Sequence, residues 1–350
     1  MSARGRHLLV AVPGLCGPAS DPPVSDYLQD SRPAALDRLL SRARLHQTSA
    51  HGLDATLGGF FGLPVAADGE MSVAPFTWLA DTGEPAAAAW LMRADPVHLR
   101  ADQSCLRLFD CHSFGITREE ADALVAAFNT HFRDRGYELA APRPQRWYLS
   151  LPQPPALQTL SPDRVAGQDI DPCLPRGKDA ADWHALLNEV QMLFHSHPVN
   201  AAREQRGMPP INSIWPWGGG RLPGPLQPRV TRLLAVHPLA TGLALHTSIP
   251  AAGMPVTADA VLAGPGDGCT LLVDDRLEWP THYGDIEAWL EGLQGLETDW
   301  LAPLQAALQN GMLASLEIHP CNGRAFVVTR SDLRRFWRRV QAFEIACTDR

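Results

Sequence analysis

Short apolar runs alternate with long amphipathic segments along this chain, and this alternation restricts the fold more than any other feature. Strand-like runs lie at residues 7–15, 146–151, 232–238, 269–275, 313–320 and 324–330. Helical spacing of apolar residues marks 33–45, 117–139, 178–199 and 285–311, and the second of these segments closes with a short strand candidate. Strands that alternate with helices predict an α/β fold, with a mostly parallel sheet covered by helices on both faces.

Composition and charge exclude several classes of protein. The chain has 350 residues, of which 45% are hydrophobic, so a substantial core is expected. Its formal net charge is -8, which argues against binding to nucleic acid through bulk charge. No apolar run approaches the ~20 residues that span a bilayer, so we expect no membrane partner. The seven scattered cysteines contain no C-x-x-C pair and suggest neither a disulfide framework nor a zinc site, so we expect a cytoplasmic protein.

An acidic loop follows the apolar run at 269–273. It gathers Asp274, Asp275, Glu278, His282 and Asp285, and such hard oxygen ligands with an imidazole suit a divalent metal. Acidic loops after strands are also common on protein surfaces, so both interpretations stay open.

Two further polar groups are candidates. Glu317 and His319 alternate along a strand candidate, so both side chains are expected on one side of it. The stretch 94–104 carries Asp95, His98, Arg100 and Asp102, which suit either a salt-bridged surface or a ligand site.

The segment "INSIWPWGGGRLP", residues 211–223, sets two tryptophans against three glycines. It predicts a rigid turn in which the backbone approaches a ligand or another part of the protein closely. Asn200, Arg203 and Arg206 precede it, and an arginine beside such a turn can clamp a carboxylate or a phosphate.

The segment "RSDLRRFWRRVQAF", residues 330–343, is strongly basic. We expect an amphipathic C-terminal helix with a solvated basic face, and an acidic protein partner is the alternative reading of the arginines from Arg330 to Arg339. The glycine-rich segment 52–64 matches neither common phosphate-loop pattern, and a packed loop is expected there.

These segments together resemble the archaeal-type, cofactor-independent phosphoglycerate mutases. The resemblance is most specific in "HPVNAAREQRGMPPINSIWPWGGG", residues 197–220. Weaker similarities at 32–45, 52–64, 114–132 and 297–308 occur in the same order along the chain as in the family. The chain looks closer still to proteobacterial phosphoglycerate mutase-like regulatory proteins of poorly defined function.

The resemblance implies an alkaline-phosphatase-like α/β core with a smaller inserted α+β lid domain. We expect the core at 1–80 and 178–350, and the lid with a proline-rich junction at 81–177. Active members of the family hold two divalent metals and attack phosphate with a Ser or Thr nucleophile. By resemblance, Asn200, Arg203, Asn212, Trp217 and Gly218 would bind a small phosphorylated ligand.

The catalytic positions depart from the family pattern. Pro13 and Gly14 stand where the family has an Asp-Gly pair, and the nucleophile position falls on Leu53, with Asp54 retained. A shift of register would nominate Ser49 or Thr56 instead.

Three further positions resemble metal ligands of the family. They are Glu278, His282 and His319, which would hold Mn or Zn if the protein is active.

A chain that lacks both a metal ligand and the nucleophile is expected to have lost two-metal phosphoryl transfer. We therefore expect a regulatory or ligand-binding pseudoenzyme that needs no cofactor. Two alternatives stay open: a metal-dependent phosphomutase or phosphatase with a rearranged site, and an interaction protein that docks through its basic C-terminal segment.

Overall fold

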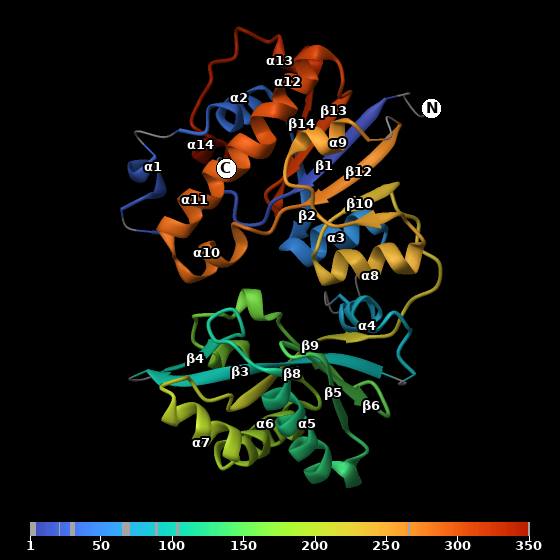
Figure 1. The fold of residues 1–350 in the computed structure, drawn as a ribbon, viewed down its shortest axis with the longest axis vertical. Coiled ribbons are helices and arrows are strands. Elements are labelled where there is room, and N and C mark those ends of the chain that lie inside the picture. The colour runs from blue at the N-terminus through green and yellow to red at the C-terminus, as the bar shows by residue number, and fades with distance from the viewer. Residues whose placement is uncertain are drawn as a thin grey trace. The chain divides into compact units, whose positions relative to one another are not determined.

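The computed structural model describes residues 5–20, 22–28, 32–64, 71–87, 90–102, 105–264 and 267–348. It divides into two compact units (Figure 1). The core unit comprises Met1–Leu63 and Pro225–Arg350, and the inserted unit comprises Pro64–Gly224. Each unit is described by itself.

The core unit is built on a seven-stranded sheet in the order β11-β10-β12-β1-β13-β14-β2. Its strands are β1 (Arg6–Ala11), β2 (Arg44–His51), β10 (Arg232–Leu234), β11 (Ala251–Ala252), β12 (Gly268–Val273), β13 (Ser315–His319) and β14 (Asn322–Thr329). The pairs from β11 to β13 are parallel, whereas β14 and β2 extend the sheet in antiparallel fashion.

Helices cover this sheet on both faces. They are α1 (Val24–Tyr27), α2 (Ala34–Arg42), α3 (Leu53–Phe61), α8 (Pro238–Thr247), α9 (Ala258–Leu262), α10 (Glu278–Tyr283), α11 (Ile286–Leu296), α12 (Ala302–Asn310), α13 (Arg330–Leu333) and α14 (Phe343–Thr348). Leu8 and Val10 of β1 join a core with Trp289 and Trp300, while Leu9, which points to the other face, is equally buried. Burial on both faces explains why β1 is a continuous apolar run.

The helical region predicted at 285–311 is confirmed as two helices. A π-helical turn, Glu297–Leu301, connects α11 to α12, and Figure 1 shows them as one nearly continuous rod. Gly311, with φ 78°, ends α12 as expected.

In its described residues, the inserted unit contains a five-stranded antiparallel sheet and four helices. The strands are β3 (Trp90–Asp102), β4 (Cys105–Phe109), β5 (Glu138–Arg143), β6 (Arg146–Leu151) and β9 (Ser213–Gly220), with a separate pair, β7 (Leu157–Gln158) and β8 (Arg176–Gly177). The helices are α4 (Ala74–Thr82), α5 (Arg118–His131), α6 (Ala180–His195) and α7 (Pro198–Gln205). Single 3₁₀ turns occur at Arg133–Arg135, Pro162–Arg164 and Asp171–Cys173.

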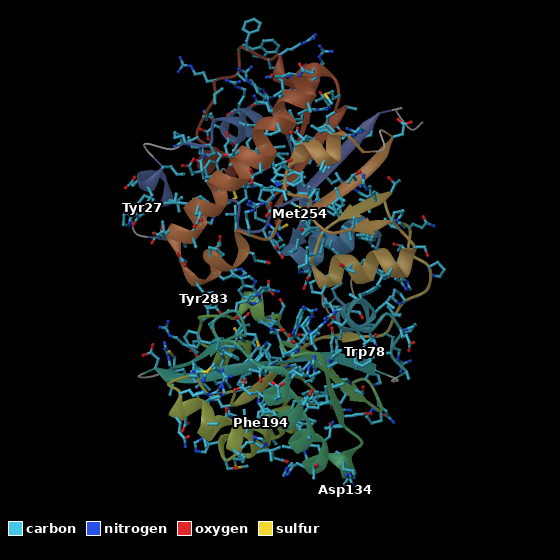
Figure 2. All side chains as sticks on the ribbon, in the orientation of Figure 1. Tyr27, Trp78, Asp134, Phe194, Met254 and Tyr283 are labelled. Atoms are coloured by element: carbon cyan, nitrogen blue, oxygen red, sulfur yellow. A yellow bond between two sulfur atoms is a disulfide. The ribbon has the colours of Figure 1, made fainter. Side chains whose placement is uncertain are left out.

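Side chains alternate between the two faces of this sheet. Trp147 of β6 packs with Phe194 of α6, the two rings 6.3 Å apart, inside the larger core of the unit. Tyr148, the next residue, packs on the other face against Trp78 of α4, with their rings 5.2 Å apart. Phe194 and Trp78 are labelled in Figure 2. A capping box begins α5, since Thr117 and Glu120 exchange both hydrogen bonds.

The predicted fold class is confirmed: an α/β core with a mostly parallel sheet, flanking helices and a smaller inserted α+β unit. The extent of the insertion differs from the expected 81–177, because the structure also groups 64–80 and 178–224 with the inserted unit. The physical reason is that β9 pairs with β3 along its length, and α6 packs into the same core. Among the described residues, no helix combines the length and the hydrophobicity needed to cross a bilayer.

Three local predictions are wrong. Segment 52–64, expected as a loop, forms α3, and segment 211–223, expected as a turn, contains strand β9. The amphipathic helix predicted at 330–343 does not form: α13 ends at Leu333, and an irregular segment leads from it to α14. In each case tertiary contacts outweigh local propensity.

Candidate functional site

The carboxyl ends of three parallel strands lie together in the core unit. Ala11, at the end of β1, is level with Val273 of β12 and with His319 of β13. The Val12 amide donates a hydrogen bond to the His319 carbonyl at 2.8 Å, and the Asp274 amide donates to the Ala11 carbonyl at 3.0 Å. Open α/β sheets bind their ligands beyond this edge, which is therefore the candidate site of the core unit.

The turn after β1 is held by side chains of two helices. Gly14, with φ 76°, accepts hydrogen bonds on its carbonyl oxygen from Thr281 Oγ1 at 3.2 Å and Trp289 Nε1 at 2.9 Å. A Cβ at Gly14 would collide with the carbonyl oxygen of Leu277. A proline side chain has no ligand atom, so Pro13 supplies no side-chain ligand to this edge.

The expected nucleophile position lies in the first turn of α3. The amide of Gly52 donates to the Cys321 carbonyl at 2.8 Å, which ties the start of α3 to the turn after β13. Leu53 follows, and it is only 3% exposed. Of the two alternatives, Thr56 is buried and donates its hydroxyl to the Gly52 carbonyl at 2.8 Å, while Ser49 is exposed in β2.

Two carboxylates contribute to the raised pKa of a buried thiol in the same region. Burial, together with the negative charges of Glu278 and Asp54, raises the pKa of Cys321 to about 12. Asp54 and Glu278, which are far apart in the sequence, thus both act on the Cys321 thiol. Cys321 itself has φ 62°, an uncommon conformation for a residue other than glycine. With so high a pKa the thiol stays protonated at neutral pH and is a poor nucleophile.

Glu317 and His319 lie on one side of β13, as their alternation predicts. Glu317 Oε1 is 2.6 Å from His319 Nε2 and 2.6 Å from an Nη of Arg229. The pKa of Glu317 is lowered: burial would raise it, but the hydrogen bond with His319 and the charge of Arg229 outweigh burial. Phe60 of α3 meets the His319 ring edge-to-face at 4.8 Å. The pair is thus bound internally, and its carboxylate already has a cationic partner.

The candidate donor atoms at this edge come from α10 and from the segment that follows β12. Glu278 and His282 lie one turn apart on α10, and the Trp279 ring packs edge-on against His282 at 5.4 Å. Asp274 accepts a hydrogen bond from Arg276 Nε at 2.8 Å. Among the residues that the structure describes, no three His, Cys, Asp or Glu side chains are placed to share one ion. The two-metal site that the family resemblance implies stays a prediction.

The tryptophan-glycine segment belongs to the inserted unit. Trp215 donates its Nε1 proton to the Leu160 carbonyl at 2.7 Å, and Trp217 donates to Asp95 Oδ2 at 2.7 Å. Gly218, with φ 59°, has no side chain, and this leaves room for Val73. A Cβ at Gly218 would lie 2.9 Å from the Val73 Cβ. The close approach predicted for this backbone is therefore made to residues of the protein itself.

A buried ion pair anchors these tryptophans. Arg93 and Asp95 of β3 are both less than a tenth exposed, and Arg93 donates to Asp95 Oδ1 through two nitrogens, at 2.6 and 3.1 Å. The guanidinium carbon of Arg93 lies 5.1 Å from the ring centre of Trp217 and 5.4 Å from that of Tyr148. Asp95 thus serves an internal network, as a satisfied buried charge must.

The expected ligand residues of the inserted unit also have partners within the protein. Asn200 is 1% exposed, and its side chain bonds to the Phe194 carbonyl and to both backbone groups of Ile211, each at 2.8 Å. Asn212 pairs with the amide and carbonyl of Leu99 at 2.7 and 2.8 Å. Their predicted ligand-binding role stays a prediction, while these contacts give them a structural role.

Arg203 is the most enclosed charge of this group. It has no exposed surface, and it donates to Glu120 Oε2 at 2.7 Å and to the Pro209 carbonyl at 2.8 Å. Arg206 donates to the other Glu120 oxygen at 2.6 Å. The sequence pointed to the arginines and missed Glu120 as their partner. Its place three residues after Thr117, in the capping box of α5, was the visible signal.

The polar stretch at 94–104 forms part of β3, and residues 103 and 104 lie outside the described ones. His98 Nδ1 lies 2.8 Å from the Pro210 carbonyl oxygen, Arg100 stacks on Phe109 at 4.5 Å, and Asp102 pairs with Arg107 at 3.1 Å. These contacts agree with the salt-bridged alternative.

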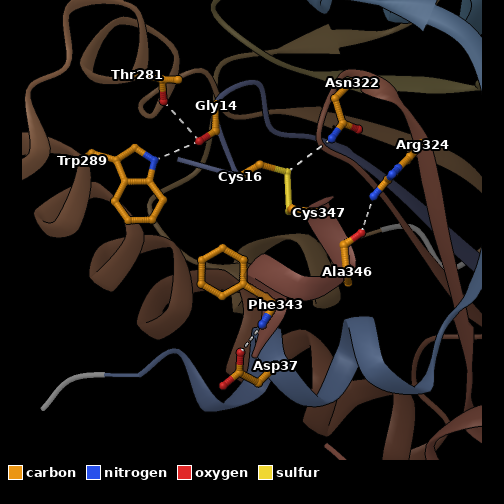
Figure 3. The surroundings of a disulfide bond; sticks show 10 residues. All are labelled: Gly14, Cys16, Asp37, Thr281, Trp289, Asn322, Arg324, Phe343, Ala346 and Cys347. Carbon is orange, nitrogen blue, oxygen red and sulfur yellow. Dashed lines mark hydrogen bonds between the residues drawn. A yellow bond between two sulfur atoms is a disulfide. The ribbon is translucent and has the colours of Figure 1, made fainter. Parts of the chain in front are cut away.

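A disulfide bond joins Cys16 and Cys347, which lie 331 residues apart in sequence (Figure 3). Their Cα atoms are 5.6 Å apart, and Asn322 Nδ2 lies 3.4 Å from the Cys16 sulfur. Cysteine spacing did not suggest this bond, because only the fold brings the turn after β1 beside α14. It fixes α14 next to the carboxyl end of β1.

Comparisons with known proteins indicate the origin of this arrangement. No protein-family model matches the chain. It is 27% identical over 205 residues to the 2,3-bisphosphoglycerate-independent phosphoglycerate mutase of Methanosarcina mazei, covering 56% of this chain and 50% of that protein. The enzyme of the same name from Methanosarcina acetivorans is 28% identical over 145 residues, covering 40% of this chain and 36% of that protein. The chain thus matches half or less of the length of these curated relatives.

The fold has a counterpart among solved structures. The PH0037 protein from Pyrococcus horikoshii aligns with a TM-score of 0.53 at 14% identity, covering 94% of this chain and 88% of that one. At this identity the likeness concerns the fold alone. The sequence similarity goes further, and it shows that this chain is homologous to the archaeal-type, cofactor-independent phosphoglycerate mutases.

Proposed function

We propose that this chain is a catalytically degenerate, phosphoglycerate mutase-like protein with a regulatory or ligand-binding role. Its named relatives are mutases, and the chain is homologous to them over the residues that match. What differs is the set of side chains at the carboxyl edge of the central sheet.

The observation that carries the proposal is Leu53 at the start of α3. The resemblance puts the nucleophile there, and the leucine side chain is buried at 3% exposure, tied in place through the hydrogen bond from Gly52 to Cys321. A hydrocarbon side chain cannot form a phospho-enzyme. Neither Thr56, whose hydroxyl is engaged in α3, nor Ser49, which is exposed in β2, replaces it in position.

The state of His319 supports the same proposal. Its Nε2 is bound to Glu317, and Glu317 in turn is paired with Arg229 at 2.6 Å. To release this imidazole for a metal, the protein would have to break a hydrogen bond and an ion pair of a partly buried carboxylate.

A small phosphorylated molecule is the ligand we propose for the retained fold. Arg229, which precedes β10 and pairs with Glu317 of β13, is half exposed, and a guanidinium binds phosphate oxygens in paired hydrogen bonds. Binding without turnover would suit a protein that senses such a metabolite, in line with the resemblance to proteobacterial regulatory proteins.

We place the protein in the cytoplasm as part of this proposal. Because reducing compartments keep most cysteines as thiols, Cys16 and Cys347 would be reduced there and would bond only on oxidation.

Binding and turnover measurements test the proposal together. We expect 3-phosphoglycerate to bind the purified chain in isothermal calorimetry, and Arg229→Gln to weaken that binding. We expect no formation of 2-phosphoglycerate, and no hydrolysis of p-nitrophenyl phosphate, with Mn²⁺ or Zn²⁺ supplied. Turnover of either compound would refute the degenerate site, and the absence of both binding and turnover would refute the ligand.

One observation favours the alternative of a metal-dependent phosphomutase or phosphatase. Asp274 at the end of β12 is 5% exposed, and its Oδ2 atom is buried without a hydrogen bond from any described residue. Such an oxygen would suit a hard cation. Metal analysis decides between the two functions: stoichiometric Mn or Zn in the wild type that is lost in Asp274→Asn and His282→Ala would establish the alternative.

A further inference from the structure

An exposed turn near the C-terminus combines aromatic and basic side chains. We name residues 334–340 the basic-aromatic turn; it follows α13 and appears as the red segment that leads from α13 toward α14 (Figure 1). Phe336 is 84% exposed and Trp337 is 68% exposed, and their rings meet edge-to-face at 5.3 Å. Val340, at 48%, extends the apolar surface. Aromatic side chains gathered in water in this way are typical of an interaction site.

Four arginines surround these rings. Arg335 is paired with Asp332 at 2.7 Å, and Arg338 donates to the Ala43 carbonyl at 2.8 Å. Arg334 and Arg339 are exposed and make no ion pair with any residue that the structure describes. The turn therefore presents two rings between two arginines whose charges are available to a partner.

Hydrogen bonds fix the N-terminal end of the turn. Asp332, at 1% exposure, accepts bonds from the amide and the hydroxyl of Thr329, at 3.0 and 2.7 Å. Its carboxylate also lies 3.4 Å from Arg44 at the start of β2. The pKa of Asp332 is lowered, because these hydrogen bonds and the nearby arginines outweigh the effect of burial, which would raise it.

The C-terminal end is fixed as well. The amide of Gln341 donates to Ser41 Oγ at 2.9 Å, and that of Phe343 donates to Asp37 Oδ1 at 2.8 Å, the latter drawn in Figure 3. The disulfide bond of Cys347 follows in α14. A turn held at both ends loses little conformational entropy when a partner binds, so its exposed side chains are suited to recognition.

We propose that the basic-aromatic turn docks an acidic protein segment that carries apolar side chains. Carboxylates of this segment would pair with Arg334 and Arg339, and its apolar groups would pack on Phe336 and Trp337. Tryptophan and arginine are the residues most enriched at the energetic centres of protein interfaces.

Net charge favours a local acidic segment over an extended polyanion. The chain carries a formal net charge of -8, so a bilayer or a nucleic acid, negative across its whole facing surface, would be repelled beyond the turn. A short acidic segment need face only the arginines of the turn.

Fluorescence anisotropy with the full chain tests the proposal. The probe is a labelled copolymer of glutamate and tyrosine, and labelled polyglutamate of the same length is its comparison. We expect the copolymer to bind more tightly than polyglutamate. Phe336→Ser with Trp337→Ser should weaken copolymer binding about tenfold and remove the difference between the probes. Arg334→Gln with Arg339→Gln should weaken both probes and reduce the dependence on salt.

A matched control changes exposed residues elsewhere. Val256, which is 84% exposed, and the exposed Arg133 become Ser and Gln, and binding should be unchanged. Circular dichroism verifies that each variant is folded. The proposal fails if both turn variants bind the copolymer like the wild type. It fails equally if phosphatidylserine vesicles or a single-stranded oligonucleotide bind the wild type more tightly than the copolymer does.

Discussion

Arg203, which has no exposed surface, donates a hydrogen bond of 2.7 Å to the carboxylate of Glu120. The other oxygen of that carboxylate binds Arg206 at 2.6 Å, and one of its oxygens also accepts the Thr117 amide at 3.1 Å. A single glutamate therefore caps α5 and holds α7 beside it. The arginine expected to meet a ligand instead holds two helices of the inserted unit together.

Replacing Glu120 by Ala should destabilise the inserted unit by about 3–5 kcal/mol, because the buried Arg203 charge would lose its partner. Hydrogen exchange of peptides from α5 and α7 would measure this loss. Asp122→Asn is the control, since Asp122 is 61% exposed in its side chain and pairs with Arg118 on the surface. Its cost should stay below about 1 kcal/mol. Equal effects of the two substitutions would contradict the role assigned to Glu120.

The stability of the chain should fall as the pH drops below the usual range of carboxyl groups. The pKa values of Glu120, Glu317 and Asp332 are lowered in the folded protein, where hydrogen bonds and arginines outweigh burial. The unfolded chain therefore takes up protons first, so each contribution is complete above the unfolded-state pKa, near 4, and is lost as the pH falls through the folded-state value.

Urea denaturation between pH 6 and pH 3 measures this dependence. The free energy of unfolding should fall by up to about 1.4 kcal/mol per pH unit for each proton taken up on unfolding. Glu317→Gln should make the dependence shallower in the core unit. A free energy of unfolding that stays constant down to pH 3 would show that these carboxylates are not stabilised by folding.

The fold was largely predictable, because its signals are local or periodic. Continuous apolar runs marked β1 and β12, which are buried on both faces, and helical spacing marked α5 and α6. Strand β9 was not predictable, because its three glycines lower strand propensity. Pairing with β3, and the Trp217 hydrogen bond to Asp95, stabilise it in the folded protein.

The glycines of β9 should be sensitive to substitution. A Cβ at Gly220 would overlap the side chain of Ser72, so Gly220→Ala should cost about 1–3 kcal/mol. Gly115→Ala in the same unit is the control, because nothing lies within 4 Å of a Cβ there. Thermal unfolding of the two variants gives the comparison. A Gly220→Ala variant as stable as Gly115→Ala would contradict the close packing of β9.

The disulfide bond should stabilise the core unit. Replacing both Cys16 and Cys347 by Ser should lower the free energy of unfolding by about 2–4 kcal/mol under oxidising conditions, since the bond restricts a very long loop of the unfolded chain. Cys105→Ser, at a free cysteine, should have little effect. Under reducing conditions the difference between the double variant and the wild type should shrink to the small cost of the side-chain change. A larger loss of stability under oxidising than under reducing conditions would assign the effect to the disulfide bond. An equal loss in both conditions would assign it to packing.

The candidate site was predictable only in part. The alternation of Glu317 and His319 placed both on one side of β13. The nucleophile position that the family resemblance puts on Leu53 stays a prediction. The roles of Arg229 and Cys321 depend on contacts between distant segments, which no spacing in the sequence reveals. The contact between Arg203 and Glu120 also joins distant segments, so the sequence predicted a ligand as the partner of Arg203.

Phosphorus NMR of 3-phosphoglycerate incubated with the purified chain and Mn²⁺ distinguishes a degenerate site from an active mutase. The mutase of Methanosarcina mazei serves as the positive control. With Leu53 buried where the family resemblance puts the nucleophile, and with His319 bound to Glu317, we predict that the 3-phosphoglycerate signal persists and no 2-phosphoglycerate appears. Formation of 2-phosphoglycerate that disappears in His319→Ala would contradict it.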